Sequence, residues 1–255
     1  MTQRFFIPAA WLTPPTVTLQ GETAHQIKNV LRLKPGAEII VLDNSGAAWQ
    51  VKLTEVGQDK IQGQLTVRQA AGGEPGLHLT LYQGMLKAQK FEWVLQKGTE
   101  LGVNCFVPMI CQRSVVNDFE AIAKKRARWE RIIQEAAEQS RRGKLPRLEG
   151  ARSFAEAIQQ ARSHPLSLMP WEEMGGSSLK EALAGTRVRA MALFIGPEGG
   201  FTADEAALAR DNGLQLVHLG PRILRAETAG LALCSVILYE RGEWQTPPGI
   251  TPDNF

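Results

Sequence analysis

The sequence predicts an α/β protein in which a mainly parallel β-sheet carries helices on both faces and follows a small β-rich domain. Two observations predict this fold class. After residue 76, apolar strand-like runs alternate with helical segments, which is typical of a parallel sheet. Before residue 70 the apolar runs are short and turn-punctuated, and the glycine-rich segment 70–76 marks a boundary. A chain of 255 residues has room for both domains.

The first domain is predicted to be a compact barrel. Alternating apolar residues such as Trp49, Val51 and Leu53 indicate half-buried strands. Turn residues separate the strands, which are expected over residues 37–43, 47–56 and 60–67.

One helix is expected within this domain, over residues 21–36. Thr23 would cap its N-terminus, with Gln26 three residues later. Pro35 and Gly36 would end it.

Strands and helices alternate in the second domain. In the helix expected over residues 87–102, Phe91, Val94 and Leu95 fall near one face and Gly102 follows as a stop. The other helices are expected over 117–143, 202–213 and 228–243. Strands are expected over 77–85, 104–111, 165–170, 189–196 and 214–220. Residues 246–255 are expected to form an extended tail.

The composition excludes several classes of protein. Apolar residues make up 44% of the chain, and no run of about 18 uninterrupted apolar residues exists, so no membrane span is expected. The N-terminus does not resemble a signal peptide. Cys105, Cys111 and Cys234 lack the spacing of metal ligands. We therefore expect buried thiols, no metal, no membrane and a cytoplasmic location.

Positive charge is concentrated in one segment. Between Lys124 and Arg147 there are nine Lys or Arg and three Glu, a local net charge of +6 in a chain whose total is +3. Such a segment can meet a polyanion such as nucleic acid. It can equally be the solvated face of a helix.

A glycine-rich loop, GPEGGF, joins a buried strand to a helix at residues 196–201. Thr202 and Glu205 form a capping box for that helix. The loop fits neither the phosphate-binding P-loop pattern nor the dinucleotide fingerprint. Glu198 would repel phosphates and suits a ligand with hydroxyls or an ammonium group. The alternative is that the loop is only a tight strand-to-helix turn.

A second loop of the same kind follows the next strand. It also begins with Gly-Pro, at Gly220, and its apolar pair Ile223 and Leu224 lies before Arg225. The pair could fill the core, and Arg225 could form a local ion pair with Glu227. Neither alternative explains why two loops of this type close two successive strands. Ligands of open α/β sheets bind at such loops.

These two segments, IGPEGGFTADE at 195–205 and LGPRILRAETA at 219–229, resemble the signature motifs of the ribosomal RNA small-subunit methyltransferase E family, within the SPOUT superfamily. Further similarity lies in HQIKNVLRLKPG, KGTELGV and EAAEQSRR, so the resemblance spans nearly the whole chain. Ala226 departs from the family, where many relatives carry threonine, which argues against a role for a hydroxyl there.

The resemblance implies a fold, an activity and partners. Residues 1–72 would be a PUA-like RNA-binding β-barrel domain. Residues 73–245 would be a SPOUT methyltransferase domain with a C-terminal trefoil knot. The family uses S-adenosylmethionine to methylate N3 of one uridine in 16S ribosomal RNA, and works as a homodimer. The substrate would be this RNA in an assembled small subunit.

The resemblance and the residue types together suggest three groups of site residues. Arg225 would stabilise negative charge on the uracil as N3 loses its proton, with Glu227 orienting Arg225 or capping the helix. The cofactor would be bound by Met169, Ile195, Gly196, Pro197, Glu198, Gly199, Gly200, Leu219, Gly220, Ile223, Leu224 and Arg225. RNA would be contacted by Arg4, Arg32, Lys87, Lys97, Arg113, Arg141 and Arg142.

Two other functions are compatible with an α/β chain. A non-catalytic RNA-binding protein could retain this fold, although the intact pair of cofactor loops is evidence against it. A nucleotide-binding oxidoreductase or hydrolase would need a phosphate-binding glycine pattern or a catalytic triad, and the sequence has neither.

Overall fold

The computed structural model describes residues 2–87, 89–171 and 177–245, and the tail predicted at 246–255 lies outside them. The chain forms two compact units. The first comprises Met1–Glu74 together with Ile133–Leu145, and the second comprises Pro75–Ile132 and Pro146–Phe255. The predicted boundary after residue 72 falls two residues before this division.

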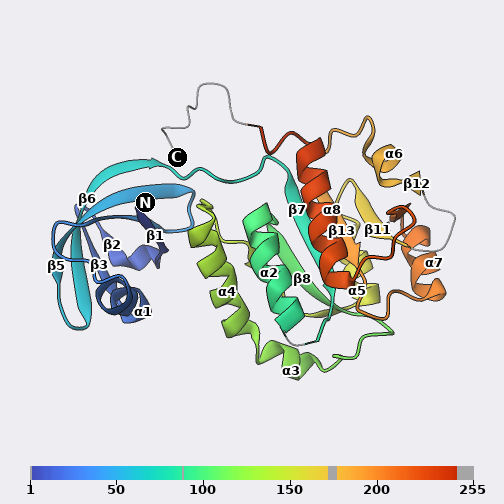
Figure 1. The fold of residues 1–255 in the computed structure, drawn as a ribbon, viewed down its shortest axis with the longest axis horizontal. Coiled ribbons are helices and arrows are strands. Elements are labelled where there is room, and N and C mark those ends of the chain that lie inside the picture. Colours follow the sequence, from blue (N-terminus) through green and yellow to red (C-terminus); the bar gives the residue numbers. More distant parts are fainter. Residues whose placement is uncertain (1, 88, 172–176, 246–255) are drawn as a thin grey trace. The chain divides into compact units, whose positions relative to one another are not determined.

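The first unit is built on a six-stranded sheet (Figure 1). Its strand order is β1-β4-β5-β6-β3-β2, with β1 parallel to β4 and the other pairs antiparallel. Their side chains alternate along the strands, and the inward set, including Phe5, Val41 and Leu53, forms one buried apolar cluster. The strands are β1 (Gln3–Phe6), β2 (Leu12–Thr13), β3 (Thr16–Gln20), β4 (Glu38–Leu42), β5 (Ala47–Val56) and β6 (Lys60–Ala70).

The helix predicted in this unit is shorter than expected. It consists of α1 (Gly21–His25), continued by a π-helical turn (Gln26–Val30), and it ends before Arg32, which has φ 54°. Its N-cap is Gln20, without a side-chain hydrogen bond, so the predicted Thr23 cap is wrong. The helix begins early because Gly21, with φ 59°, turns the chain directly out of β3.

The second unit contains a parallel sheet of order β10-β8-β7-β13-β11-β14-β12, with β9 beside β8. Each pair in it is parallel, as the alternation of strands and helices predicted. Its strands are β7 (His78–Gly84), β8 (Cys105–Ile110), β9 (Arg147–Leu148), β10 (Arg152–Ser153), β11 (Ser167–Pro170), β12 (Ser177–Ser178), β13 (Ala190–Ile195) and β14 (Gln215–His218).

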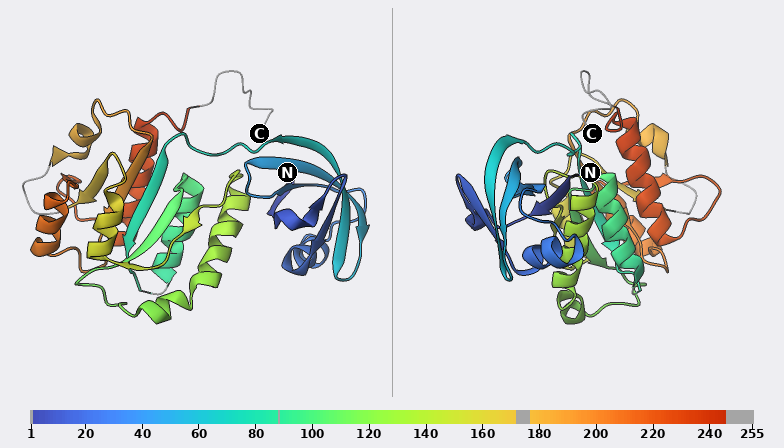
Figure 2. Two further views of the ribbon diagram at one scale, coloured as in Figure 1. Left: turned by 180° about the vertical axis from the view of Figure 1, so that it is seen from behind. Right: turned by 60° about the vertical axis from the view of Figure 1, so that its left-hand side comes forward.

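Helices cover both faces of this sheet (Figures 1 and 2). On one face α2 packs on α8, which also contacts β7 and β13. On the other face, Phe154 from α5 and Ala206 from α7 join an apolar cluster in which Tyr82 stacks on Phe194 at 4.4 Å between ring centroids. These helices are α2 (Gln89–Leu101), α5 (Phe154–Ala161), α7 (Ala203–Asp211) and α8 (Ala226–Glu240), with a short α6 (Leu179–Leu183).

The long helix predicted over 117–143 is broken into α3 (Phe119–Ala123) and α4 (Arg126–Gln139). Asp118 caps α3 by accepting hydrogen bonds from the N–H groups of Glu120 and Ala121. Residues 124 and 125 between the two helices are lysines, which are common in helices, so the sequence carries no sign of the break. Helix α5 was not predicted from the sequence, although Ser153 and Glu156 form a capping box at its start.

The three cysteines are buried as free thiols, as predicted. Burial raises the pKa of Cys105 to about 11, with the negative charge of Glu149 adding to the effect. Among the described residues, no helix has the length and apolarity to cross a membrane, and no group of three or more His, Cys, Asp or Glu side chains could hold a metal ion.

Candidate functional site

The two glycine-containing loops leave the same edge of the parallel sheet. β13 ends at Ile195 and β14 ends at His218, and because the strands are parallel their carboxyl ends meet at one edge. A single strand, β11, lies between them. Segments 196–202 and 219–225 therefore flank the end of β11, the position at which open α/β sheets bind ligands.

The first loop contacts the end of β7 backbone to backbone. A Cβ on Gly84 would lie 2.5 Å from the Pro197 nitrogen and 2.7 Å from the Gly196 carbonyl carbon. The buried amide of Gln83 donates from Nε2 to the carbonyl of Gly84 at 3.2 Å and to that of Gly196 at 3.5 Å. At these glycines the absence of a Cβ lets two backbone segments of the protein lie in contact.

Gly84→Ala is therefore expected to displace the loop. The atoms that the new Cβ would meet belong to the backbone and to a proline ring, so we expect about 1–3 kcal/mol of destabilisation. Chemical denaturation measures the effect. Gly150→Ala is the matched control, because a Cβ there meets nothing within 4 Å. Equal behaviour of the two variants would contradict the expectation.

Arg113 supports the same loop from the end of β8. Its Nη1 donates to the carbonyl of Gly199 at 3.0 Å and to that of Phe201 at 3.1 Å. The predicted capping box is present, with Thr202 and Glu205 bonded reciprocally. Glu205 also accepts from the Gln112 N–H at 2.8 Å. The loop is thus fastened at both ends.

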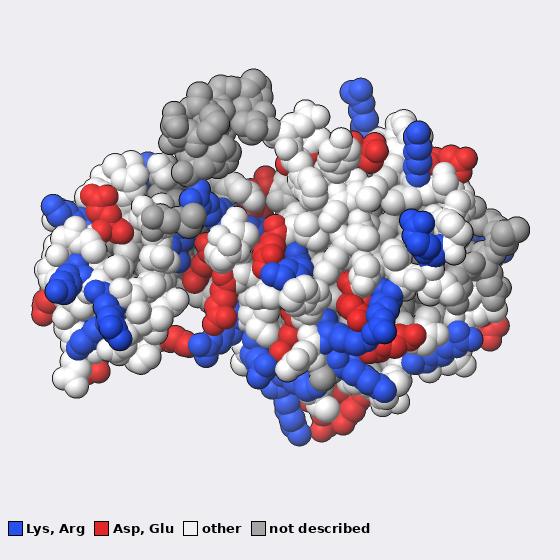
Figure 3. Space-filling model, viewed as in Figure 1, with Lys and Arg blue, Asp and Glu red and all other residues white. Residues whose placement is uncertain are grey.

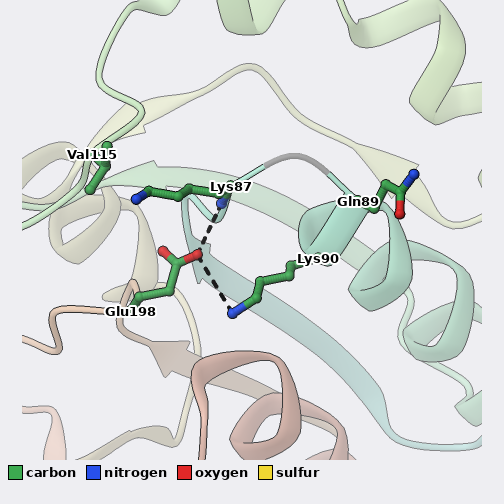
Figure 4. Close-up of a pocket in the computed structure, with 5 residues that line it drawn as sticks. All are labelled: Lys87, Gln89, Lys90, Val115 and Glu198. Atoms are coloured by element: carbon green, nitrogen blue, oxygen red, sulfur yellow. Dashed lines mark hydrogen bonds and ion pairs between the residues drawn. The ribbon is translucent and has the colours of Figure 1, made fainter.

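A cavity of about 510 Å³ opens beside Glu198 (Figure 4). Glu198 Oε1 accepts a hydrogen bond from the Lys87 N–H at 3.1 Å and lies 4.0 Å from Lys90 Nζ. The described residues that line the cavity are Lys87, Gln89, Lys90, Val115 and Glu198. Two ammonium groups, one amide and one carboxylate thus offer a ligand charges of both signs and hydrogen-bonding groups.

Glu227, in the first turn of α8, is held by the same lysine. Its Oε1 lies 3.1 Å from Lys90 Nζ, whereas its Oε2 is buried without a hydrogen-bond partner. Burial raises the pKa of Glu227, but hydrogen bonds from its own N–H and from Lys90, and the charges of Lys90 and Arg225, outweigh burial and lower it. Glu227 is therefore ionised at neutral pH.

The second loop presents apolar surface to solvent. Ile223 is 86% exposed, and Gly220, with φ 83°, has open space where a Cβ would lie. Leu219 and Leu224 are half-buried. Arg225 is exposed as the N-cap of α8, and its side chain makes no capping bond. An exposed apolar residue beside an open turn is what a flat apolar ligand would cover.

Two predicted cofactor residues lie at the carboxyl ends of β11 and β13 with their side chains buried. Met169 is fully buried in the apolar cluster beneath β11, and Ile195 is 2% exposed. Their side chains fill the core because consecutive positions of a strand covered on both faces are all buried. They offer a ligand only their backbone.

The RNA candidates of the first unit differ in exposure. Arg32 is exposed, whereas Arg4 and Arg141 are half-buried. Arg142 is 2% exposed, and its Nη2 lies 2.7 Å from Glu74 Oε2. Because this guanidinium is committed to an internal ion pair, we remove Arg142 from the predicted RNA contacts.

The RNA-contact candidates of the second unit also differ in exposure and in their partners. Lys87 is exposed at the cavity, and Lys97 is paired with Glu100 at 2.7 Å. Arg113 is exposed but bonded to the glycine loop. Figure 3 shows blue side chains gathered over α3 and the start of α4. The exposed basic residues there are Lys124, Lys125, Arg126 and Arg128.

Sequence reasoning missed Lys90 and Gln83. Lys90 stands in the first turn of a charged helix, where a lysine is usually solvated, and Gln83 lies within an apolar strand. A polar residue in a buried strand was the available signal for Gln83. No local pattern indicated that Lys90 bridges two loops more than 100 residues away.

Comparison with known proteins agrees with this geometry. A family model described as RNA methyltransferase domain matches residues 73–238, and one described as RNA methyltransferase PUA domain matches 19–66. Ribosomal RNA small subunit methyltransferase E of Bacillus subtilis is 36% identical over 232 residues, covering 89% of this chain and 91% of its own. The protein of the same name from Synechocystis is 34% identical, covering 90% and 75%.

Solved structures show the same similarity. Ribosomal RNA small subunit methyltransferase E from Neisseria gonorrhoeae, bound to S-adenosylmethionine, has 30% identity and a TM-score of 0.86, covering 94% of this chain and 98% of its own. A putative methyltransferase from Legionella pneumophila in complex with the same cofactor has 28% identity, the same coverage and a TM-score of 0.86.

Proposed function

Because this chain belongs to the ribosomal RNA small subunit methyltransferase E family, we propose that it methylates N3 of one uridine in 16S ribosomal RNA with S-adenosylmethionine as donor. The observation that carries the proposal is that segments 196–202 and 219–225 leave one edge of the parallel sheet on either side of β11. An RNA methyltransferase needs a cofactor cleft, and these loops build its walls.

The residues present fit this cofactor. Ile223 offers exposed apolar surface for an adenine, and Gly220 leaves open space beside it. Glu227 Oε2 is a buried acceptor without a partner, which a hydrogen-bond donor of a ligand would satisfy. Two carboxylates, Glu198 and Glu227, complement a ligand that carries a sulfonium and an ammonium group.

The protein's chemical task is then limited. The bound cofactor supplies a methyl group already activated by its sulfonium. Arg225, exposed at the start of α8, stabilises the negative charge that develops on the uracil carbonyls as the N3 proton passes to solvent water. Glu227 accepts its hydrogen bonds from Lys90 and its own N–H, so its part is to stabilise the start of α8.

RNA must reach this edge with the target base unpaired, because N3 lies on the Watson–Crick edge. The exposed Lys87 at the mouth of the cavity is a proposed contact for the RNA near the target base. Arg4, Arg32 and Arg141 of the first unit are proposed phosphate contacts, together with Lys97 and the exposed basic residues at α3 and α4. Arg113 supports the glycine loop and contributes charge beside it.

Three further properties belong to this proposal: a homodimer, a C-terminal trefoil knot and a cytoplasmic location. An apolar surface on and beside α8 supports the dimer. Val236, Tyr239 and Trp244 are 44%, 67% and 56% exposed there. Large apolar side chains exposed side by side are typical of a protein–protein contact surface. We expect sedimentation velocity to give twice the protomer mass, and Tyr239→Glu to reduce it to one.

Mapping of ribosomal RNA by mass spectrometry tests the function. RNA from cells that lack this protein is expected to miss one methyl group, and purified protein with S-adenosylmethionine is expected to restore it on small subunits. Binding of S-adenosylhomocysteine without any transfer would instead favour a non-catalytic RNA-binding protein. A complete set of methylated uridines in the deletion strain would contradict the proposal.

A further inference from the structure

Lys90 lies where three segments distant in sequence come together. Its Nζ is 3.1 Å from Glu227 Oε1, at the start of α8, and 4.0 Å from Glu198 Oε1, in the glycine loop. Lys90 itself stands in the first turn of α2. One ammonium group thus faces an acidic residue of the glycine loop and an acidic residue in the first turn of α8, which follows the second loop (Figure 4 shows the Glu198 side).

The two carboxylates depend on this cation. The side chains of Glu227 and Glu198 are only 17% and 27% exposed, so water screens them incompletely. Glu198 has one further donor, the Lys87 N–H, and Glu227 keeps one buried oxygen without a partner. With Lys90 removed, two partly buried negative charges would face each other, and like charges at such sites repel.

No other described side chain pairs with both Glu198 and Glu227. Arg113 bonds the glycine loop only, through backbone carbonyls, and Arg225 acts on Glu227 through its charge without a hydrogen bond. Lys90 therefore ties the glycine loop to the start of α8 by charge, in addition to the packing of α8 on β7 and β13.

We propose that Lys90 is a positioning residue of the cofactor site, which holds the glycine loop against the start of α8 by pairing with Glu198 and Glu227. The expected loss of cofactor affinity rests on the proposed function. The expected loosening of the glycine loop and the start of α8 does not. Without the cation the loops separate, and the cleft that they wall loses its shape.

The first experiment needs no ligand. Amide hydrogen exchange reports the two loops through Gly200 N–H, which donates to Pro197 O at 2.9 Å, and Ala229 N–H, which donates to Arg225 O at 2.8 Å. In Lys90→Ala we expect exchange at these amides to accelerate by about fivefold to tenfold, while amides of β5 stay unchanged. Lys90→Arg keeps the charge and is expected to restore most of the protection.

The second experiment is calorimetry with S-adenosylhomocysteine. Lys90→Ala is expected to bind it about tenfold more weakly, a loss typical of one partly buried charged contact. Lys60→Ala is the control, because it removes an exposed lysine of β6 to which the site gives no role. If wild-type protein does not bind the compound, the proposed function fails, and the exchange experiment still decides the role of Lys90.

A double variant separates charge from shape. Glu198→Gln removes one of the two repelling charges, so adding it to Lys90→Ala is expected to recover part of the lost protection and affinity. Should Lys90→Ala fail to fold, Lys90→Gln takes its place with the same expectations. Unchanged exchange and affinity in the alanine variant would overturn the proposal, and so would failure of Lys90→Arg to restore either.

Discussion

Replacing Arg225 by alanine is expected to slow methyl transfer by about a hundredfold at saturating RNA, with S-adenosylhomocysteine affinity changed only a few-fold. Arg225 is the exposed N-cap of α8, and its side chain does not hold the helix end, so its loss should leave the fold intact. Its charge already reaches Glu227, whose pKa it helps to lower. A single-turnover assay measures the step in which negative charge appears on uracil.

Arg222→Ala is the control for this experiment. It removes the same charge from the same exposed loop, three residues earlier, where it does not adjoin α8. We expect a weaker effect, confined to RNA affinity. Equal slowing by the two variants would show that the loop contributes only general positive charge, and a normal rate in Arg225→Ala would remove the residue from the mechanism.

Replacing Glu74 by alanine is expected to destabilise the first unit by about 3–5 kcal/mol. Glu74 accepts from Arg142 Nη2 at 2.7 Å and Nε at 3.1 Å, and from the N–H groups of Gly143 and Lys144, both at 3.1 Å. Its loss would leave the Arg142 guanidinium, only 3% exposed, without its carboxylate. The midpoint of chemical denaturation measures the change.

A matched exposed pair provides the comparison. Glu130 lies 2.8 Å from Arg126, and both side chains are about half exposed, so Glu130→Ala should cost less than about 1 kcal/mol. Replacing both Glu74 and Arg142 by apolar or neutral residues should recover part of the stability, because the buried guanidinium is then removed together with its carboxylate. Similar losses in Glu74→Ala and Glu130→Ala would contradict the assignment of Arg142 to the interior.

The local features of this protein could be predicted from sequence because they arise over a few residues. The Thr202 capping box, the stop at Gly102 with φ 113° and the strand runs of the parallel sheet all depend on side chains within one turn or one strand. The two glycine-containing loops could be located because each directly follows an apolar run that predicts a strand. Where a local signal was weak, as at Thr23 or across the break between α3 and α4, the prediction failed.

The sequence by itself determined the strands, the helices and the two motifs that indicate the family, since each is written in neighbouring residues. Only the tertiary structure decided what individual polar side chains do. Arg142 turned inward to Glu74, Met169 entered the core, and Lys90 came to face both Glu198 and Glu227. The partner of a charge is fixed by which distant segment packs beside it, and residue type alone does not carry that information.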